Sequence, residues 1–239
     1  MRIVSTVPSL TELLSYLDLD DEIVGITKFC IHPDHIHRSK TRVGGTKDLK
    51  VDLIRQLSPD LIIANKEENE KDQIEILKEY SEVLLTDISD LESAFEAILE
   101  IGQRTGTAEK AKALCDEIEN GFTALRPKKE KKVLYLIWRE PYMSIGHDTF
   151  IHDMLDRCGF DSVTGHLTRY PEVKSGEFDP KLILLSSEPY PFKQKHVEEI
   201  EKAWPQSEVK LIDGEYFSWY GSRMVEASSY FNALIEQLN

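Results

Sequence analysis

Two near-matching phrases, Pro59-Asp60-Leu61-Ile62-Ile63 and Pro180-Lys181-Leu182-Ile183-Leu184, decide the fold because they lie in opposite halves of the chain. In each phrase a proline and a charged residue lead into an apolar run, and an acidic residue, Glu67 or Glu188, follows eight residues after the proline. A short apolar run bounded by turn residues predicts a buried strand. The pair indicates a fold that was built twice, with a functional site expected between the halves.

The composition predicts a folded, acidic protein. The 239 residues, 41% of them hydrophobic, suffice for one large or two modest domains. The 43 acidic and 29 basic residues give a formal charge of −14, which repels nucleic acid and anionic lipid, so we expect no nucleic-acid partner. No apolar run approaches the ~20 residues that span a bilayer, so we expect no membrane segment.

Short apolar runs alternate with helical patterns, which predicts parallel sheets covered by helices. The expected strands cover residues 2–7, 22–27, 61–64, 82–86, 133–138, 162–164, 182–186 and 209–213. The expected shorter helices cover residues 9–17, 68–80, 89 to about 106, 149–157, 193–204 and 222–238. Ser9 and Glu12 have the spacing of a capping box, which predicts that the first helix begins at Ser9.

Apolar residues recur at intervals of three and four from Thr107 to Leu125. This spacing predicts one helix roughly 28 Å long, at 1.5 Å per residue, followed by a charged run over residues 126–132. We interpret residues 107–126 as a rigid strut that joins a lobe of residues 1–106 to a lobe of residues 127–239. The predicted fold class is α/β, with two Rossmann-like lobes joined by a single long helix. An ordinary covering helix of one continuous domain is the alternative.

The residues that follow the strands are candidates for a binding site, because ligands of open α/β sheets lie beyond the carboxyl ends of the strands. The candidate ligand-binding residues are Pro8, Ser9, His32, Glu67, Glu68, Trp138, Arg139, Glu140, Tyr142, Glu188, Tyr190, Trp219, Tyr220 and Arg223. This mixture of aromatic and charged side chains is typical of a site for a large, flat ligand with a polar edge.

We expect the aromatic candidates to stack on the ligand and the charged ones to contact its edge. The expected stacking residues are Trp138, Tyr142, Trp219 and Tyr220. The expected edge contacts are Glu67, Arg139, Glu140, Glu188 and Arg223. Each loop aromatic could equally be a packing residue, and that alternative stays open at this point.

The segment with Cys30, His32, His35 and His37 has the closest spacing of metal-ligand residue types. Thiolate and imidazole suit zinc, iron or cobalt, although the spacing matches no zinc signature and Pro33-Asp34 looks like a turn. Two hypotheses follow: a metal site that uses Cys30 and His32, or His32 as the axial ligand of a metal held in a macrocycle. His147 is a further candidate.

The cysteines indicate the redox environment, and the missing enzyme motifs argue against catalysis. Cys30, Cys115 and Cys158 form no CxxC pair, which predicts free buried thiols in a reducing compartment.

No G-x-S-x-G, phosphate-loop, G-x-G-x-x-G or H-E-x-x-H motif is present. Glu67 and Glu188 could act as a general acid and base, but nothing nearby marks a nucleophile. We expect no enzymatic activity and no intrinsic cofactor.

Three phrases resemble a known family: Arg2-Ile3-Val4-Ser5-Thr6-Val7-Pro8-Ser9-Leu10-Thr11-Glu12-Leu13, Pro59-Asp60-Leu61-Ile62-Ile63-Ala64 and Gly221-Ser222-Arg223. They are similar to the solute-binding proteins of ABC importers for cobalamin, haem and iron-siderophores. The likeness is greatest to the cobalamin-binding type, the helical-backbone metal receptors. The resemblance implies a class III periplasmic-binding-protein-like fold, with the ligand in a cleft between two lobes held by one long helix.

The resemblance also implies that one acidic residue on each lobe docks on the membrane subunits of an ABC transporter. Asp52, seven residues before Pro59, resembles the first of these, and Glu172 or Glu177 resembles the second. The chain opens Met1-Arg2-Ile3 with no leader pattern, so we expect a subgroup without a leader peptide in the cytoplasm. The location would be periplasmic if a leader had been removed.

The function expected from the sequence is capture of a cobalamin, haem or ferric chelate between the lobes, for an ABC importer or for intracellular carriage. One alternative is a metal-dependent enzyme that uses the Cys30 and His32 loop. The other is a protein-interaction module with a vestigial cleft.

Overall fold

The computed structural model describes residues 1–127 and 131–238. Its contacts divide the chain into two compact units. Unit 1 is made of residues 1–88, 92–119 and 219–225, and unit 2 is made of the described residues of 89–91, 120–218 and 226–239. The segment 219–225 therefore belongs to unit 1, although residues of unit 2 precede and follow it in the sequence.

Unit 1 is built around a parallel sheet whose described strands have the order β3-β2-β1-β4-β5. The strands are β1 (Ile3–Ser5), β2 (Ile23–Ile26), β3 (Thr41–Arg42), β4 (Leu61–Asn65) and β5 (Glu82–Thr86). The helices are α1 (Pro8–Tyr16), α2 (Asp34–Ser39), α3 (Val51–Leu57), α4 (Lys71–Lys78), α5 (Leu91–Thr105) and α6 (Ala108–Thr123). Because all pairings are parallel, the carboxyl ends of the strands meet at one edge of the sheet.

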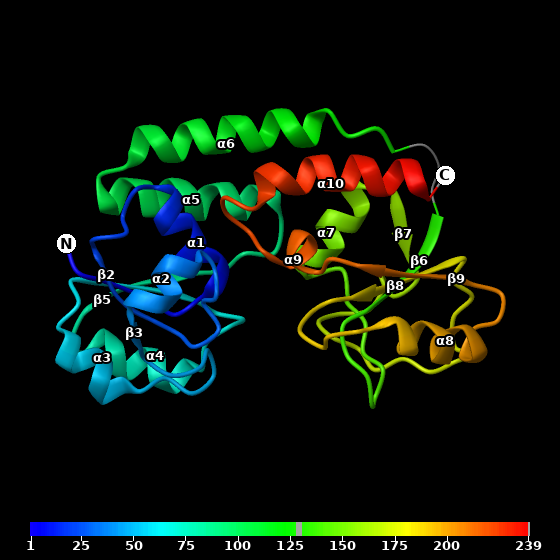
Figure 1. Cartoon of the computed structure of the whole chain (residues 1–239), viewed down its shortest axis with the longest axis horizontal. Helices are drawn as coiled ribbons and strands as arrows, with labels where there is room; N and C mark the ends of the chain where they lie inside the picture. The colour runs from blue at the N-terminus through cyan, green and yellow to red at the C-terminus, as the bar shows by residue number, and fades with distance from the viewer. Residues whose placement is uncertain (128–130, 239) are drawn as a thin grey trace. The chain divides into compact units, whose positions relative to one another are not determined.

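Helices cover both faces of the unit 1 sheet (Figure 1), with α3 and α4 on one side and α1 and α5 on the other. On the α3–α4 side, Ile62 of β4 packs in one core cluster with Ile54 of α3 and Leu77 of α4. Burial on both faces explains why β4 reads as a continuous apolar run rather than as an alternating one.

Unit 2 repeats the plan with a parallel sheet of order β7-β6-β8-β9. The strands are β6 (Lys131–Leu136), β7 (Phe160–Ser162), β8 (Leu182–Ser186) and β9 (Glu208–Ile212). The helices are α7 (Phe150–Arg157), α8 (Gln194–Ala203), α9 (Glu215–Ser218) and α10 (Met224–Gln237). Figure 1 shows α8 on one side of this sheet and α7 and α10 on the other, and Leu134, Ile183 and Ile200 share the core cluster on the α8 side.

The two near-matching phrases form corresponding strands. β4 pairs with β1, in the register Ile3 with Leu61, and β8 pairs with β6, in the register Val133 with Leu182. Each pairing lies where the strand order reverses direction, which is the place where open α/β sheets bind ligands. The prediction of a fold built twice, with two parallel-sheet α/β lobes, is confirmed.

The structure corrects two local predictions. The first helix begins at Pro8, and no side chain caps it, so the capping box predicted at Ser9 is wrong. Proline suits the first helical turn because its fixed φ is helical and the missing N–H has no partner there. The predicted turn at Pro33-Asp34 is instead the start of α2, with Pro33 at the N-cap position.

The long helix predicted from periodicity is α6, and it contributes residues to both units. Residues 108–119 belong to unit 1 and residues 120–123 to unit 2. Part of the charged run expected after it, residues 128–130, lies outside the described residues. The rigidity of this helix and the lobe boundaries at residues 106 and 127 stay predictions.

Candidate ligand-binding site

Two polar residues end the corresponding strands β4 and β8, and each orders the loop that follows. The buried Asn65 accepts hydrogen bonds through Oδ1 from the backbone N–H groups of Glu67 (2.8 Å) and Glu68 (3.3 Å). The buried Ser186 accepts a bond from the backbone N–H of Glu188 (3.3 Å) and donates one to its carbonyl (2.5 Å). The loops that contain Glu67 and Glu188 are thus both held by hydrogen bonds between the last side chain of the preceding strand and the loop backbone.

The acidic loop after β4 places two carboxylates next to each other. Burial raises the pKa of Glu68 above its usual range, the neighbouring Glu67 raises it further, and Lys47 opposes both. The Lys47 ammonium donates to the carbonyl oxygen of Glu67 at 2.6 Å. In unit 2, the hydroxyl of Ser218 donates to the carboxylate of Glu188. The contact of Glu67 and Glu188 with the edge of a ligand stays a prediction.

The loop between β2 and α2 buries its thiol. Cys30 has no exposed surface and is hydrogen-bonded through Sγ with the hydroxyls of Thr11 and Thr27, each at 3.1 Å. Burial raises the pKa of this thiol, so a thiolate is disfavoured at neutral pH. This geometry speaks against Cys30 as a metal ligand.

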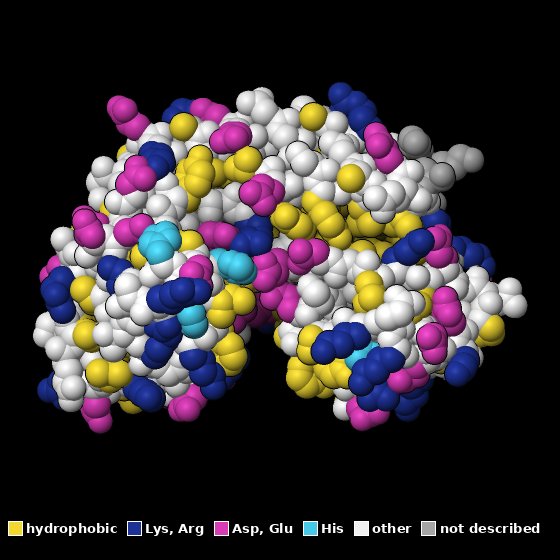
Figure 2. Space-filling view, viewed as in Figure 1, with side chains coloured by type: hydrophobic (Ala, Val, Ile, Leu, Met, Phe, Trp, Pro, Cys, Tyr) yellow, Lys and Arg dark blue, Asp and Glu magenta, His cyan; other side chains and the backbone are white. Residues whose placement is uncertain are grey.

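The same loop exposes an imidazole beside apolar side chains. His32 is half-buried, whereas Phe29 and Ile31 are 50% and 48% exposed. The Nζ atom of Lys28 lies 4.9 Å from the centre of the Phe29 ring. Figure 2 shows histidine and basic side chains gathered over α2 on unit 1. The loop therefore offers an apolar surface, an imidazole and positive charge at the carboxyl end of β2.

The segment 219–225 brings three predicted site residues from the end of the sequence into unit 1. Arg223 donates from Nε and Nη2 to the two carboxylate oxygens of Glu12, at 2.9 and 2.6 Å. Its guanidinium carbon lies 4.7 Å from the centre of the Trp219 ring, which meets the His32 ring edge-on at 5.8 Å. Gly221 makes the turn, with a φ of +105° that a side chain would strain.

Trp219 and Tyr220 are each only 7% exposed. Arg223 lies over the Trp219 ring, and the His32 ring contacts it edge-on. Their stacking on a ligand stays a prediction, and it would require the rings to be uncovered. Arg223 is likewise occupied by Glu12 rather than directed at a ligand edge.

The loops after β6 and β8 bring two aromatic side chains together. Trp138 is 41% exposed, and its ring meets the half-buried ring of Tyr190 edge-on at 5.7 Å. The two residues follow β6 and β8, the neighbouring strands at the switch in strand order. The structure thus brings together two of the candidate ligand-binding aromatics, one of which, Trp138, is an expected stacking residue.

Arg139 and Tyr142, from the same loop, converge on one carboxylate of α8. Arg139 forms a bidentate ion pair with Glu199, and the Tyr142 hydroxyl donates to the same group at 2.6 Å. The hydrogen bonds from Arg139 and Tyr142 hold the pKa of Glu199 below its usual range. Burial of the Tyr142 hydroxyl, together with its hydrogen bond to Glu199, raises the pKa of Tyr142 to about 12. Arg139 also pairs with the exposed Glu140 at 2.6 Å.

The remaining binding candidates are less distinctive. Pro8 and Ser9 form the first turn of α1, with Ser9 buried. His35 pairs with Asp20 at 2.7 Å, and His37 is hydrogen-bonded through Nδ1 with the Cys30 carbonyl at 3.0 Å. His147 is exposed, and its Nδ1 lies 2.7 Å from the Leu167 carbonyl. Within residues 1–127 and 131–238, no group of three or more His, Cys, Asp or Glu could hold a metal ion.

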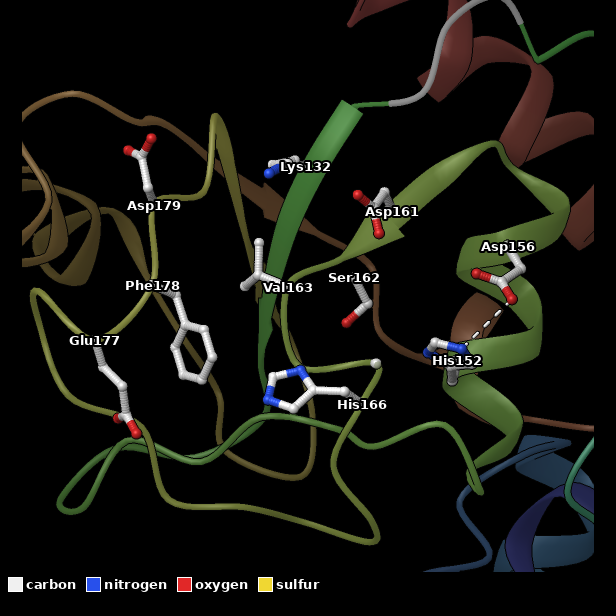
Figure 3. A pocket seen from close by; sticks show the side chains of 11 residues that line it. Lys132, His152, Asp156, Asp161, Ser162, Val163, His166, Glu177, Phe178 and Asp179 are labelled. Carbon is white, nitrogen blue, oxygen red and sulfur yellow. Dashed lines mark ion pairs between the residues drawn. The ribbon is translucent and has the colours of Figure 1, made fainter.

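The predicted docking residues are all exposed. Asp52 lies in the first turn of α3, and Glu172 forms an isolated bridge with Met143. Glu177 accepts a hydrogen bond from the backbone N–H of Lys174 at 3.0 Å and lines a cavity of about 670 Å³ on unit 2. Figure 3 shows Glu177 and Asp179 on one side of this cavity and His152, Asp156 and Asp161 on the other. Its lining is therefore rich in carboxylates.

The sequence did not single out Glu12 or Glu199 as site residues, although both fix predicted ones. Glu12 is 211 residues from Arg223, and Glu199 is 60 residues from Arg139. The spacing of Glu12 suggested a capping box, and Glu199 lies in an unremarkable charged helix face. The sequence carried no signal for either pair, because each joins residues far apart in a chain with 43 acidic residues.

Comparison with known proteins identifies the class. A sequence profile of the periplasmic binding protein family matches residues 3–184, and the chain belongs to this family. The chain is 28% identical over 167 residues to an uncharacterized ABC transporter substrate-binding lipoprotein of Bacillus subtilis, covering 65% of this chain and 52% of that protein. It is 23% identical to a vitamin B12-binding protein of Photorhabdus laumondii, covering 100% of this chain and 88% of that protein. The chain spans about half the length of the Bacillus relative.

Solved structures share the fold over nearly the whole chain. A possible iron-binding protein from Staphylococcus epidermidis superposes with a TM-score of 0.82 at 21% identity, covering 99% of this chain and 98% of that chain. A periplasmic haem-binding protein from Roseiflexus sp. gives a TM-score of 0.82 at 17% identity, with the same coverage. At these identities the likeness establishes the fold alone, and it confirms the predicted class III architecture.

No helix within the described part of the chain, residues 1–127 and 131–238, is long and apolar enough to cross a bilayer.

Proposed function

We propose that this protein is a non-enzymatic solute-binding protein that captures a metal-containing macrocycle or chelate, such as cobalamin, haem or an iron-siderophore, for an ABC importer. Membership of the periplasmic binding protein family supports a binding role, because the family is one of binding proteins. Relatives and structural neighbours described as vitamin B12-binding, haem-binding and possible iron-binding proteins support this class of ligand. The compartment stays a prediction, and the names of the relatives favour the periplasm or a lipid anchor over the cytoplasm.

The observation that carries the proposal is the loop between β2 and α2. Its exposed Phe29 and Ile31 give an apolar surface of the kind that a flat macrocycle can cover, and the half-buried His32 adds an imidazole. Neutral imidazole is a ligand for iron and cobalt. The exposed Trp138 and its partner Tyr190 supply a second aromatic surface on unit 2.

The test is a titration with three probes: hemin, aquocobalamin and a ferric siderophore. Capture predicts a change in the probe's absorbance and a higher melting temperature, because a ligand at about 100 times its Kd adds ~2.7 kcal/mol of stability. For a chain of this size that amounts to a shift of several degrees. If no probe alters either readout at saturation, the capture proposal is wrong.

A matched pair of variants tests the role of His32. We expect His32→Asn to alter the spectrum of bound hemin or aquocobalamin. His35→Asn, on the same loop and helix but paired with Asp20, should leave the spectrum unchanged. An identical spectrum for wild type and His32→Asn would remove the axial-ligand hypothesis and leave capture through the apolar surface alone.

The ABC transporter partner is part of the same proposal. Asp52 on unit 1 and Glu172 or Glu177 on unit 2 are the proposed docking residues, and their exposure is compatible with that role. Charge reversal by Asp52→Lys should abolish ligand uptake by cells while leaving the Kd for the ligand unchanged. Uptake equal to wild type would rule out docking through Asp52.

A further inference from the structure

A continuous set of contacts in unit 1 links Glu12 to His32. Glu12 holds Arg223 through two hydrogen bonds, and their side chains are only 23% and 13% exposed. Arg223 lies over Trp219, and Trp219 contacts His32. Glu12 comes from α1, His32 from the loop after β2, and the other two from the segment 219–225.

The ion pair determines where the guanidinium lies. Two parallel N–H···O bonds fix the plane of an arginine as well as its position. Removal of the Glu12 carboxylate takes away both of these bonds, and with them the constraint that they place on the plane of the guanidinium. The position of the guanidinium over Trp219 would then change, because a cation–π contact is a weaker restraint than a bidentate ion pair.

The orientation of Trp219 in turn restricts His32. The two rings meet at 68°, an edge-on arrangement that aromatic pairs prefer. His32 is half-buried, and the buried indole of Trp219 limits the space that the imidazole can occupy on one side. A side chain held in one rotamer loses less entropy when it binds a ligand than a free one.

We propose that Glu12 is a positioning residue of the His32 site, acting through Arg223 and Trp219 without touching the ligand. This proposal rests on the proposed function in one respect: it assumes that His32 contacts the ligand. The orientation of His32 itself is independent of any ligand. Its consequence for binding is preorganisation of the imidazole.

The first experiment uses the ligand-free protein. Trp219 shifts the NMR resonances of the His32 ring by its ring current, and a His32→Asn variant assigns those resonances. We expect Glu12→Gln to move them toward the values of an unrestrained histidine. The control is Asp153→Asn, which breaks the ion pair of Arg157 with a carboxylate of equal exposure, 23%, in unit 2. Unchanged His32 resonances in Glu12→Gln would overturn the proposal.

The second experiment uses hemin and aquocobalamin as probes. We expect Glu12→Gln to bind about two- to tenfold more weakly than wild type, with a reduced spectral signature of imidazole ligation. The double variant Glu12→Arg with Arg223→Glu restores an ion pair but puts a carboxylate beside the indole. It should recover thermal stability without recovering the spectrum.

The outcomes separate the two proposals. If the double variant recovers both stability and spectrum, Glu12 only fastens the segment 219–225 and the positioning role is overturned. If wild type binds neither probe, the proposed function loses its support, while the NMR result still decides whether Glu12 orients His32. If wild type binds and Glu12→Gln binds identically, the inference fails and the proposed function stands.

Discussion

Arg139 and Glu199 form a bidentate ion pair, with Nε and Nη2 of Arg139 each 3.0 Å from a different carboxylate oxygen. The Tyr142 hydroxyl donates to the same carboxylate, so two nitrogens of Arg139 and one hydroxyl, all from one loop, bind the Glu199 carboxylate on α8. The arginine that the sequence assigned to the edge of a ligand is therefore neutralised within unit 2. A ligand that uses Arg139 must compete with Glu199.

Removal of the Glu199 charge should change the pH dependence of stability. The hydrogen bonds from Arg139 and Tyr142 lower the folded pKa of Glu199 below the ordinary 4.5, so its stabilising effect is fully present above about pH 4.5 and is lost as pH falls through the lowered pKa. We expect Glu199→Gln to be less stable than wild type at pH 7 and to approach it in acid. Urea unfolding at pH 7, 5 and 3 measures this, with the exposed neighbour Glu198→Gln as control. A deficit that stays constant down to pH 3 would contradict the explanation.

The pKa of Glu68 is shifted in the opposite direction to that of Glu199, so its effect on the pH dependence of stability is also opposite. Burial and the charge of Glu67 raise its folded pKa above 4.5, so the unfolded chain ionises first and the folded state loses relative stability as pH rises toward the raised pKa. We expect Glu68→Gln to melt at a higher temperature than wild type at pH 7 and at a similar temperature near pH 3. Glu79→Gln, at an exposed position after α4, is the control. A Glu68→Gln protein that is less stable at pH 7 would show that the carboxylate is favourably bound.

Asn65 should contribute to stability through the loop that it orders. Its side chain accepts from two backbone N–H groups and donates to the Thr86 hydroxyl at 3.1 Å. Asn65→Ala leaves these groups without their partner, at a cost of about 1–3 kcal/mol. Denaturant unfolding measures the loss. Asn120→Ala, exposed in α6, should be neutral or slightly stabilising because alanine favours helix. Equal effects in the two variants would mean that Asn65 has no special role.

Strands could be predicted wherever the sequence carries a buried apolar run. Each of the eight expected strands overlaps an observed one. β5 and β8 have the expected bounds, whereas β7 shares only Ser162 with the strand expected at residues 162–164. The missed elements are those too short to show a period. β3 has only two residues, and α2 and α3 have six and seven. The local sequence favours a turn at Pro33-Asp34, but α2 begins at Asp34 and buries Ile36 in the core, so tertiary packing favours the helix.

The candidate site could be predicted only in part, because strand ends are local features and side-chain partners are not. The positions of Trp138 and Tyr190 after adjacent strands follow from topology, and their contact follows from that. The burial of Trp219 could not be inferred, since it depends on a segment that packs with residues some 200 positions earlier. The ion pair of Arg223 with Glu12 could not be inferred for the same reason, because its partners are 211 residues apart in the sequence.

The exposed ring of Trp138 gives the most direct test of the aromatic surface on unit 2. Trp138 is 41% exposed and braced by Tyr190, so its truncation should cost little stability while removing surface on which a ligand can stack. An aromatic contact of ~0.5–1.5 kcal/mol corresponds to about two- to tenfold in Kd. We therefore expect Trp138→Ala to weaken binding of hemin or aquocobalamin by that factor and Trp138→Phe to retain most of the affinity. Tyr80, 44% exposed at the end of α4, provides the matched control, because Tyr80→Ala removes a similarly exposed ring that follows no strand. Absorbance titrations of the three variants decide the matter: equal losses for Trp138→Ala and Tyr80→Ala, or no loss in either, would remove Trp138 from the binding surface.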